Sequence, residues 1–465
     1  MENTLVSELV AVFSKQERRA VAQYLKSPYF NHREDVCLLF DLLAEDDGMN
    51  GKTEIWEKLF PGAPYNDQQM RLLGSYLFRL LQQYLVLTEY ESEPCGHRHL
   101  LLSAYRKRKL PRHFEKAGRA AQKTLEEQAL RHAAYHFENY RLEHEQYLHL
   151  LGTGRTKELN LQNVEYQLTM AMISMKLRQA CYLRAHQAVF KTVYRIELLD
   201  EILALAEKPP YRELPSVSLY RHCYRALFES GDEKHFAEFK TLLFAHGSHF
   251  PRDEMASLYL LALNFCIKKI NEGARQYLRE ALDLYREGLR TELLLEDGKI
   301  SHFAYNNITG IALRLPDEWA WAGHFVNTYQ SYLDPAHREA AHSLNSARLA
   351  YVRRSYDEAL SHLQRADYKD LINGMVAKVL QLKIYFETSE HELLDAHLKT
   401  MRMFVRRNKR MGYHHRNWRN IVHFTQKLLE LNPYDEEQKS ALRKAIESEE
   451  VLTEREWLLE QLEDV

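Results

Sequence analysis

One pair of histidines, four residues apart, has a spacing that could support metal binding. His132 and His136 stand in RHAAYHFENYRLEHEQYLH, and Glu143 and His144 follow in the same segment. On one helix, the two imidazoles would share a face and could bind a metal ion. The chain has 23 histidines spread throughout, however, so coincidental pairs of this kind are expected. We therefore expect no metal site at these residues.

Two further motifs have spacings close to those of known sites. HELLD, at 391–395, differs from the zinc-protease motif H-E-x-x-H in its last residue, and such a site also needs a third metal ligand. GTGRTK, at 152–157, lacks the spacing of a phosphate-binding loop and follows a helix instead of a strand, so we interpret it as a turn between helices. The sequence therefore predicts no catalytic residues, no metal and no cofactor.

Basic residues gather in two stretches of a chain whose net charge is only −2. Residues 97–119 have eight Lys or Arg against one Glu, and residues 401–420 have seven and no acid. Helical phasing assigns Phe404 and Trp418 in the second stretch to packing, so they are not expected to be platforms for stacked bases. Six of the seven cations of this stretch are called the basic ridge: Arg402, Arg406, Lys409, Arg410, Arg416 and Arg419.

The basic ridge could be solvated without any partner, or it could meet one of three kinds of acidic partner. Residues 434–465 have eleven acids against four Lys or Arg, so the ridge could pair with this tail, which begins YDEEQ. The other two partners are an acidic protein surface and a nucleic acid, whose phosphates bind Lys and Arg in a salt-dependent way. A winged-helix interpretation of 53–90 is disfavoured, because residues 1–96 have fifteen acids against nine Lys or Arg.

The composition is that of a globular protein, with 45% hydrophobic and 28% charged residues. The 465 residues contain only 17 glycines and 12 prolines, which favours long helices with few turns. The N-terminus lacks the pattern of a signal peptide, and the longest uncharged apolar window, 166–175, is about half the roughly 20 residues that cross a bilayer. Five widely spaced cysteines suggest no disulfide framework. We expect a cytoplasmic protein with no membrane contact.

The hydrophobic periodicity predicts an all-α chain in three parts. We expect a short-helix N-terminal module at 1–96, a long antiparallel helical hairpin at 97–210 and a helical repeat array at 211–465. The hairpin should contain helices at about 112–150 and 158–207, and the length of the second favours a kink or a break within it.

Short segments mark the boundaries of these parts. YLVLTEY, at 84–90, is the nearest candidate for a strand, but it ends a helical pattern. EKPPYRELP, at 207–215, is a proline-rich boundary before the repeat array. Beyond it, helix pairs should begin near residues 216, 252, 299, 337, 371 and 414, with a period typical of helical solenoids.

The repeat array contains an internal match, in which Ala262, Ala274, Leu278 and Ala281 recur with identical spacing as Ala347, Ala359, Leu363 and Ala366. Small residues at these offsets let two antiparallel helices approach closely. This pattern resembles the tetratricopeptide repeat (TPR), best in 345–366, next in 261–281, and over about 255–405 in all. The chain also resembles uncharacterised bacterial all-helical proteins that begin with L-x-S-P-x-F-N elements, here LKSPYFN at 25–31.

The TPR resemblance implies an α-solenoid whose concave side binds a protein or a peptide. The positions that it places on this side are Tyr259, Asn307, Arg314, Arg348, Tyr351 and Lys383. An asparagine with several cations could hold an acidic peptide through charge-assisted hydrogen bonds. We therefore expect a non-catalytic scaffold or adaptor, with nucleic-acid binding through 97–119 and 401–420 as the alternative. The sequence leaves the oligomeric state open.

Overall fold

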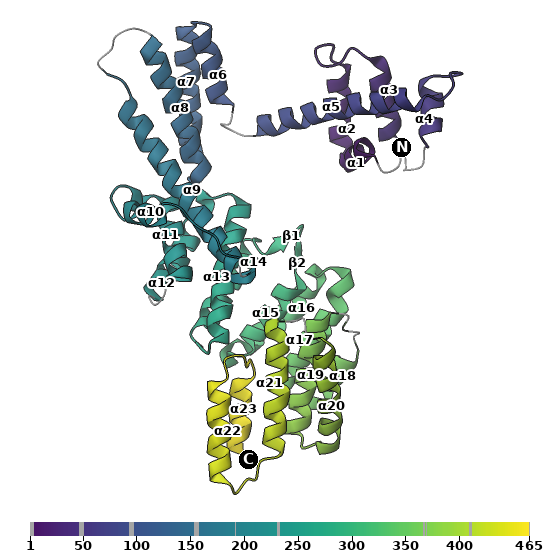
Figure 1. The fold of residues 1–465 in the computed structure, drawn as a ribbon, viewed down its shortest axis with the longest axis vertical. Coiled ribbons are helices and arrows are strands. Elements are labelled where there is room, and N and C mark those ends of the chain that lie inside the picture. Colours follow the sequence, from purple (N-terminus) through teal and green to yellow (C-terminus); the bar gives the residue numbers. More distant parts are fainter. Residues whose placement is uncertain are drawn as a thin grey trace. The chain divides into compact units, whose positions relative to one another are not determined.

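The computed structural model describes residues 4–45, 51–92, 97–152, 158–190, 192–229, 233–365, 368, 370–408 and 412–464 (Figure 1). Of the residues that the structure describes, 79% are helical and 1% are in strands, which confirms the predicted all-α class. It falls into two compact units, Met1–Ala129 with Ala134–Ala171 and Leu130–Ala133 with Met172–Val465. The division into 1–96, 97–210 and 211–465 stays a prediction.

The first unit begins with five helices: α1 (Leu5–Val12), α2 (Lys15–Lys26), α3 (Glu34–Ala44), α4 (Lys52–Leu59) and α5 (Asp67–Ser92). Helix α3 contacts the other four, and their apolar faces form one buried cluster. Ser14 and Glu17 form the N-terminal capping box of α2, with Glu17 N donating to Ser14 Oγ at 3.2 Å and Ser14 N to Glu17 Oε2 at 2.8 Å. The strand candidate at 84–90 is part of α5, as its helical pattern indicated.

The predicted helix at 112–150 is wrong as a single element. The structure has α6 (Arg98–Lys107), α7 (Pro111–Glu127), α8 (Ala133–Gly152) and α9 (Leu161–Phe190). Residues 128–132 are not helical, and there the backbone N of Arg131 donates to His249 O at 2.7 Å. This tertiary hydrogen bond replaces a bond that the amide would make inside a helix, so it overrides the local helix propensity.

The predicted break in the second long helix is confirmed. Helix α9 ends at Phe190, and the next helix, α10, spans only Leu199–Ala206. Residues 192–196 are irregular, and Leu198 has a left-handed backbone with φ of 58°. No helix among the described residues has the length and apolar content that crossing a membrane requires.

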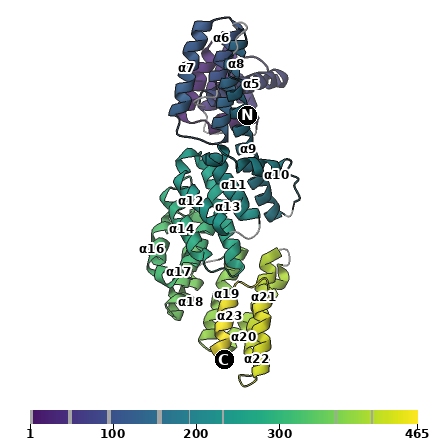
Figure 2. The same cartoon turned by 90° about the vertical axis from the view of Figure 1, so that its left-hand side faces the viewer.

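Helices of the second unit pack in consecutive pairs, as a helical repeat requires (Figures 1 and 2). The pairs are α11 (Pro215–Phe228) with α12 (Glu233–Ala245), α13 (Arg252–Asn271) with α14 (Tyr277–Arg290), α15 (His302–Ala312) with α16 (Trp319–Tyr329), α17 (Pro335–Val352) with α18 (Tyr356–Gln364), and α19 (Leu371–Glu387) with α20 (His391–Arg407). Each pair begins close to its predicted start. A β-hairpin with strands of two residues each, β1 (Leu295–Glu296) and β2 (Lys299–Ile300), lies between the second and third pairs.

The small residues of the internal match are buried within these pairs. Ala262 and Ala281 of α13 and α14 are inaccessible to solvent, as are Ala347 and Ala359 of α17 and α18. Their burial supports the packing role that the sequence predicted for them. Ala366, the last residue of the match, lies outside the described residues.

Three helices complete the second unit: α21 (Gly412–Leu429), α22 (Glu436–Ser448) and α23 (Arg455–Asp464). Helix α21 contacts α20 and α23, and α22 contacts α23, so the C-terminal helices lie together beside α19 and α20 (Figure 2). One apolar cluster joins these five helices, and Trp418, Trp457 and Leu462 are among its buried members. This cluster positions both sites described below.

Candidate functional site

Four of the six residues predicted for the concave face lie around one point of the second unit. Arg314 follows α15, Arg348 and Tyr351 belong to α17, and Lys383 belongs to α19. Acids from the start of the last helix, α23, reach the same point. Lys383 Nζ lies 2.9 Å from Glu454 Oε2, and Arg314 Nη2 lies 3.4 Å from Glu456 Oε2.

A further cation joins this arrangement from the turn between α13 and α14. Arg275 Nε lies 3.6 Å from the other carboxylate oxygen of Glu456. Arg275, Arg314 and Lys383, together with Glu454 and Glu456, are called the C-terminal clamp. Its cations come from three helix pairs, and its acids come from a single segment of the chain's own C-terminal region.

Two aromatic residues beside Lys383, Tyr351 and Trp457, are hydrogen-bonded to a further acid, Glu387. Tyr351 and Tyr356 both donate hydrogen bonds to the Glu387 carboxylate, the second at 2.7 Å. Trp457 Nε1 donates to Glu387 Oε1, also at 2.7 Å. Lys383 Nζ lies 5.0 Å from the centre of the Tyr351 ring and 5.5 Å from that of Trp457, within the range of cation–π attraction.

Electrostatics at the clamp favour ionised Glu454. Burial acts to raise the pKa of Glu454, but the positive charges of Lys383, Arg314 and Arg348 outweigh it, so the pKa is lowered from its ordinary 4.5. Burial also lowers the pKa of Arg348 from 12.5 to about 10, against the attraction of Glu454. Arg348 therefore remains a cation at neutral pH, and the Glu454 carboxylate lies among the positive charges of Lys383, Arg314 and Arg348.

The other two predicted concave residues are placed differently. Tyr259 is only 2% exposed, because its ring stacks on Phe244 of the preceding helix with centroids 6.2 Å apart. This corrects its expected accessible position: Tyr259 precedes the packing residue Ala262 by three residues and therefore shares its buried face. Asn307 is exposed.

A buried asparagine ladder beside Arg348 was missed by the sequence interpretation. Asn345 Nδ2 donates to Asn306 Oδ1 at 2.6 Å, and Asn306 Nδ2 donates to Asn373 Oδ1 at 2.8 Å. These residues come from α17, α15 and α19, so the ladder crosses three successive pairs. Arg348 Nη1 donates to Asn345 Oδ1 at 3.1 Å, which fixes the guanidinium. Phasing on the buried Tyr305 and Thr309 could have distinguished Asn306 from its exposed neighbour.

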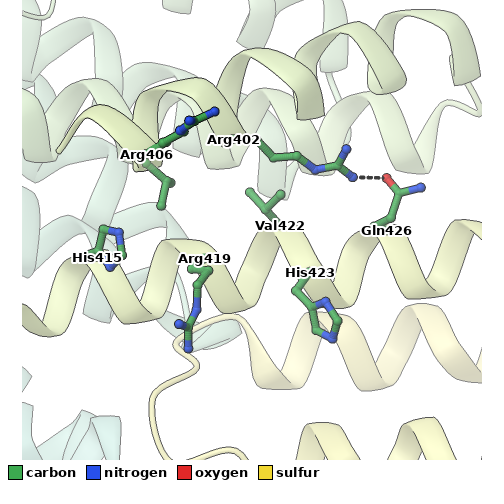
Figure 3. Close-up of a pocket in the computed structure, with 8 residues that line it drawn as sticks. Arg402, Arg406, His415, Arg419, Val422, His423 and Gln426 are labelled. Carbon is green, nitrogen blue, oxygen red and sulfur yellow. Dashed lines mark hydrogen bonds between the residues drawn. The ribbon is translucent and has the colours of Figure 1, made fainter. Parts of the chain in front are cut away.

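Part of the basic ridge forms a groove between α20 and α21 (Figure 3). The α20–α21 groove has a volume of about 340 Å³ and is lined by Arg402, Val405, Arg406, His415, Arg419, Val422, His423 and Gln426. Val405 and Val422 are buried, whereas Arg402, Arg406 and Arg419 are exposed. Figure 3 shows the labelled polar side chains around Val422, with Arg402 Nη2 donating to Gln426 Oε1 at 2.6 Å.

The three arginines of the groove, Arg402, Arg406 and Arg419, make no ion pair with any acid that the structure describes. Asp435 of the acidic tail instead caps α22, its carboxylate accepting from Gln438 N at 2.9 Å. Trp418 is buried and meets Phe404 edge-on, which fits their predicted packing role. Arg416 is exposed but does not line the groove, and Lys409 and Arg410 lie outside the described residues.

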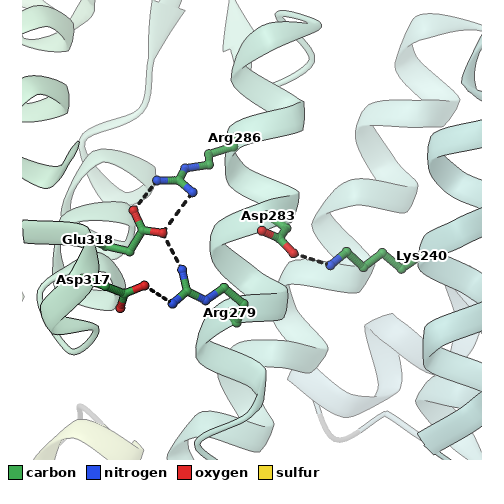
Figure 4. A network of polar contacts seen from close by, with 6 residues as sticks. All are labelled: Lys240, Arg279, Asp283, Arg286, Asp317 and Glu318. Carbon is green, nitrogen blue, oxygen red and sulfur yellow. Dashed lines mark hydrogen bonds and ion pairs between the residues drawn. The ribbon is translucent and has the colours of Figure 1, made fainter.

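A separate network of charged residues lies between α12, α14 and the start of α16, and each of its cations pairs with an acid (Figure 4). Lys240 of α12 lies 2.7 Å from Asp283 of α14, and Arg279 and Arg286 of α14 both bind Glu318, which precedes α16. Glu318 is 8% exposed. Each of these charged side chains has a partner of opposite charge on the neighbouring helix pair. We therefore assign this network to the packing between the second helices of successive pairs.

The remaining candidate motifs lie in or beside helices α8 and α20. His132 lies before α8 begins, so it does not share a helix face with His136. Asp395 of HELLD pairs with Lys399 at 2.6 Å. Across the described residues, no three His, Cys, Asp or Glu side chains group as metal ligands. Residues 153–157 of the GTGRTK segment lie outside the described ranges.

Comparison with protein-family models, with curated proteins and with solved structures found no match to this chain. The likeness to TPR proteins therefore remains a resemblance in sequence pattern. Conclusions about function rest on the geometry of the α20–α21 groove and of the C-terminal clamp.

Proposed function

We propose that the chain is a non-catalytic scaffold with a TPR-like array of helix pairs, and that it binds an acidic segment of a protein partner in the α20–α21 groove. One observation carries this proposal: three exposed arginines surround an apolar floor and pair with no described acid. Exposed guanidinium groups bind carboxylates through two parallel hydrogen bonds. The valine floor suits a short apolar side chain between two acidic residues.

Nucleic acid is the alternative partner of the groove. Its phosphates would satisfy the same arginines, but a base needs an exposed aromatic surface for stacking, and Trp418 is buried. The other basic stretch is partly neutralised, because Arg106 Nε lies 2.8 Å from Glu145 Oε2. An apolar floor and buried aromatics together favour the acidic peptide.

A labelled peptide of alternating glutamate and leucine tests the proposal by fluorescence anisotropy on the full chain. Arg406→Glu and Arg419→Glu should each weaken binding about tenfold or more, because each removes a charge-assisted hydrogen bond and adds repulsion. Arg407→Glu and Arg416→Glu are the matched controls, since both arginines are exposed on the same helices and neither lines the groove.

Equal losses in the groove variants and in the controls would contradict the proposal, because the attraction would then be a general one to positive charge. Binding of labelled RNA or duplex DNA is measured in parallel at several salt concentrations. Tight binding that falls steeply with salt, is lost in the groove variants and exceeds that of the peptide would establish the alternative instead.

A further inference from the structure

The C-terminal clamp has the contacts of a receptor with a peptide bound to it. Glu454, Glu456 and Trp457 lie within four consecutive residues, and each contacts a side chain from an earlier helix pair. Cations approach from the α13–α14 turn, from the end of α15 and from α19. A single short segment of the chain thus bridges helices that are distant in sequence.

The charges of the clamp require an acidic segment. Without residues 454–457, four cations would remain close together: Arg275, Arg314, Arg348 and Lys383. The acid nearby would be Glu387, which accepts a hydrogen bond from Tyr351, an aromatic neighbour of Lys383. Lys383 is 15% exposed and Glu454 is 28% exposed, so the pair is partly withdrawn from water. Partly buried cations that lose their counter-charge are costly, which makes this surface selective for carboxylates.

The segment is also placed so that it can leave. Residues 449–454 are not helical, so an irregular linker joins α22 to the ten-residue helix α23. Thr453 is held by Asn417 of α21, with Thr453 N donating to Asn417 Oδ1 at 2.8 Å. Trp457 and Leu458 anchor α23 in the apolar cluster. A competitor must therefore replace both the carboxylates and an aromatic side chain.

We propose that the clamp is a second peptide-binding site, which the chain closes with its own residues Glu454–Trp457. The external ligand is an acidic protein segment of the same chemistry, with two carboxylates two residues apart and an aromatic residue directly after the second. Binding of that segment releases α23. This site is distinct from the α20–α21 groove and does not depend on the function proposed for it.

A labelled synthetic peptide with the sequence of residues 449–464 tests the proposal against the full chain. The wild-type chain should bind it weakly, because its own segment competes. The double variant Glu454→Lys/Glu456→Lys should bind it at least tenfold more tightly, since lysines repel the clamp cations and open the site. Adding Lys383→Glu to this variant should abolish the gain, and a peptide with alanine at the position of Trp457 should bind poorly.

Circular dichroism tests whether the double variant is folded. A folded double variant that binds no more tightly than the wild type overturns the proposal. If the variant does not fold, hydrogen exchange of the wild-type chain decides: excess peptide should speed exchange in α23, and unchanged exchange there overturns the proposal. Arg406→Glu is the control for the separate groove, and it should leave both results unaltered.

Discussion

Lys383 and Glu454 are 71 residues apart in the chain, and their side chains lie 2.9 Å apart in the fold. The TPR resemblance placed Lys383 on the same side of the array as Arg314, Arg348 and Tyr351, and these residues lie close together in the structure, but their role in binding a partner stays a prediction. The resemblance could not identify the acid. Glu454 stands in an irregular segment just before α23, where no period reports the direction of a side chain.

Glu454→Gln should make stability less dependent on pH. The cations around Glu454 lower its pKa below the ordinary 4.5 in the folded chain, so folding favours the ionised form. Its contribution is therefore fully present above pH 4.5 and is lost as pH falls through the folded-state pKa. We expect the variant to lose about 1–3 kcal/mol of unfolding free energy at neutral pH, the range for a charged hydrogen bond, and to approach the wild type in acid.

Chemical denaturation at a series of pH values measures this difference. Glu460→Gln is the matched control, because Glu460 is an exposed residue of α23 and makes no ion pair with a described residue. A difference between Glu454→Gln and the wild type that stays constant from neutral to acid pH would falsify the electrostatic explanation.

At the scale of elements, the helix pairs follow from apolar spacing and from small residues, and their starts were predictable for that reason. The gap between α7 and α8 was not predictable from such spacing. Residues 128–132 contain no proline or glycine, and the helix is interrupted where Arg131 N binds His249 O, a contact that exists only in the folded chain. Asn306 was missed in the same way, since its partner Asn345 lies on another helix.

Two helix glycines should respond to alanine with opposite signs. A Cβ at Gly288 of α14 would lie 2.8 Å from Cγ and Cδ1 of Leu294, so the turn after the helix would have to move. Gly288→Ala should therefore destabilise the chain by about 1–3 kcal/mol, the usual cost of overpacking. At Gly310 of α15 the nearest atom, Arg348 Nη1, would be 3.6 Å away, an ordinary contact.

Gly310→Ala should stabilise the chain by about 0.5–1 kcal/mol, because alanine loses less backbone freedom than glycine when a helix forms. The unfolding free energies of both variants are compared with that of the wild type in urea. If both alanines stabilise, the contact with Leu294 relaxes freely and the packing argument for α14 is wrong.

At the scale of the whole molecule, the apolar residues form separate buried clusters. One joins α1 to α5 and includes Leu77, and another joins α19 to α23 and includes Leu398. These clusters belong to different compact units. Because side-chain packing acts over short distances, a cavity in one cluster should not loosen the other.

Leu77→Ala and Leu398→Ala form a reciprocal test of this independence. Each leucine is fully buried, so each truncation should cost about 2–5 kcal/mol within its own cluster. Hydrogen exchange followed by mass spectrometry should show faster exchange in α1–α5 for the first variant only, and in α19–α23 for the second only. Faster exchange in both regions for either variant would show that the clusters unfold together.

The sequence by itself determined the all-α class and the approximate starts of the helix pairs. Each of these depends on residues three or four positions apart, whose relation is preserved in any helix. Only the tertiary structure decided that Asn306 joins a ladder, that residues 454–457 meet the clamp cations, and that Arg402, Arg406 and Arg419 line a groove. Those outcomes depend on which distant segments approach each other, and local periodicity carries no information about that choice.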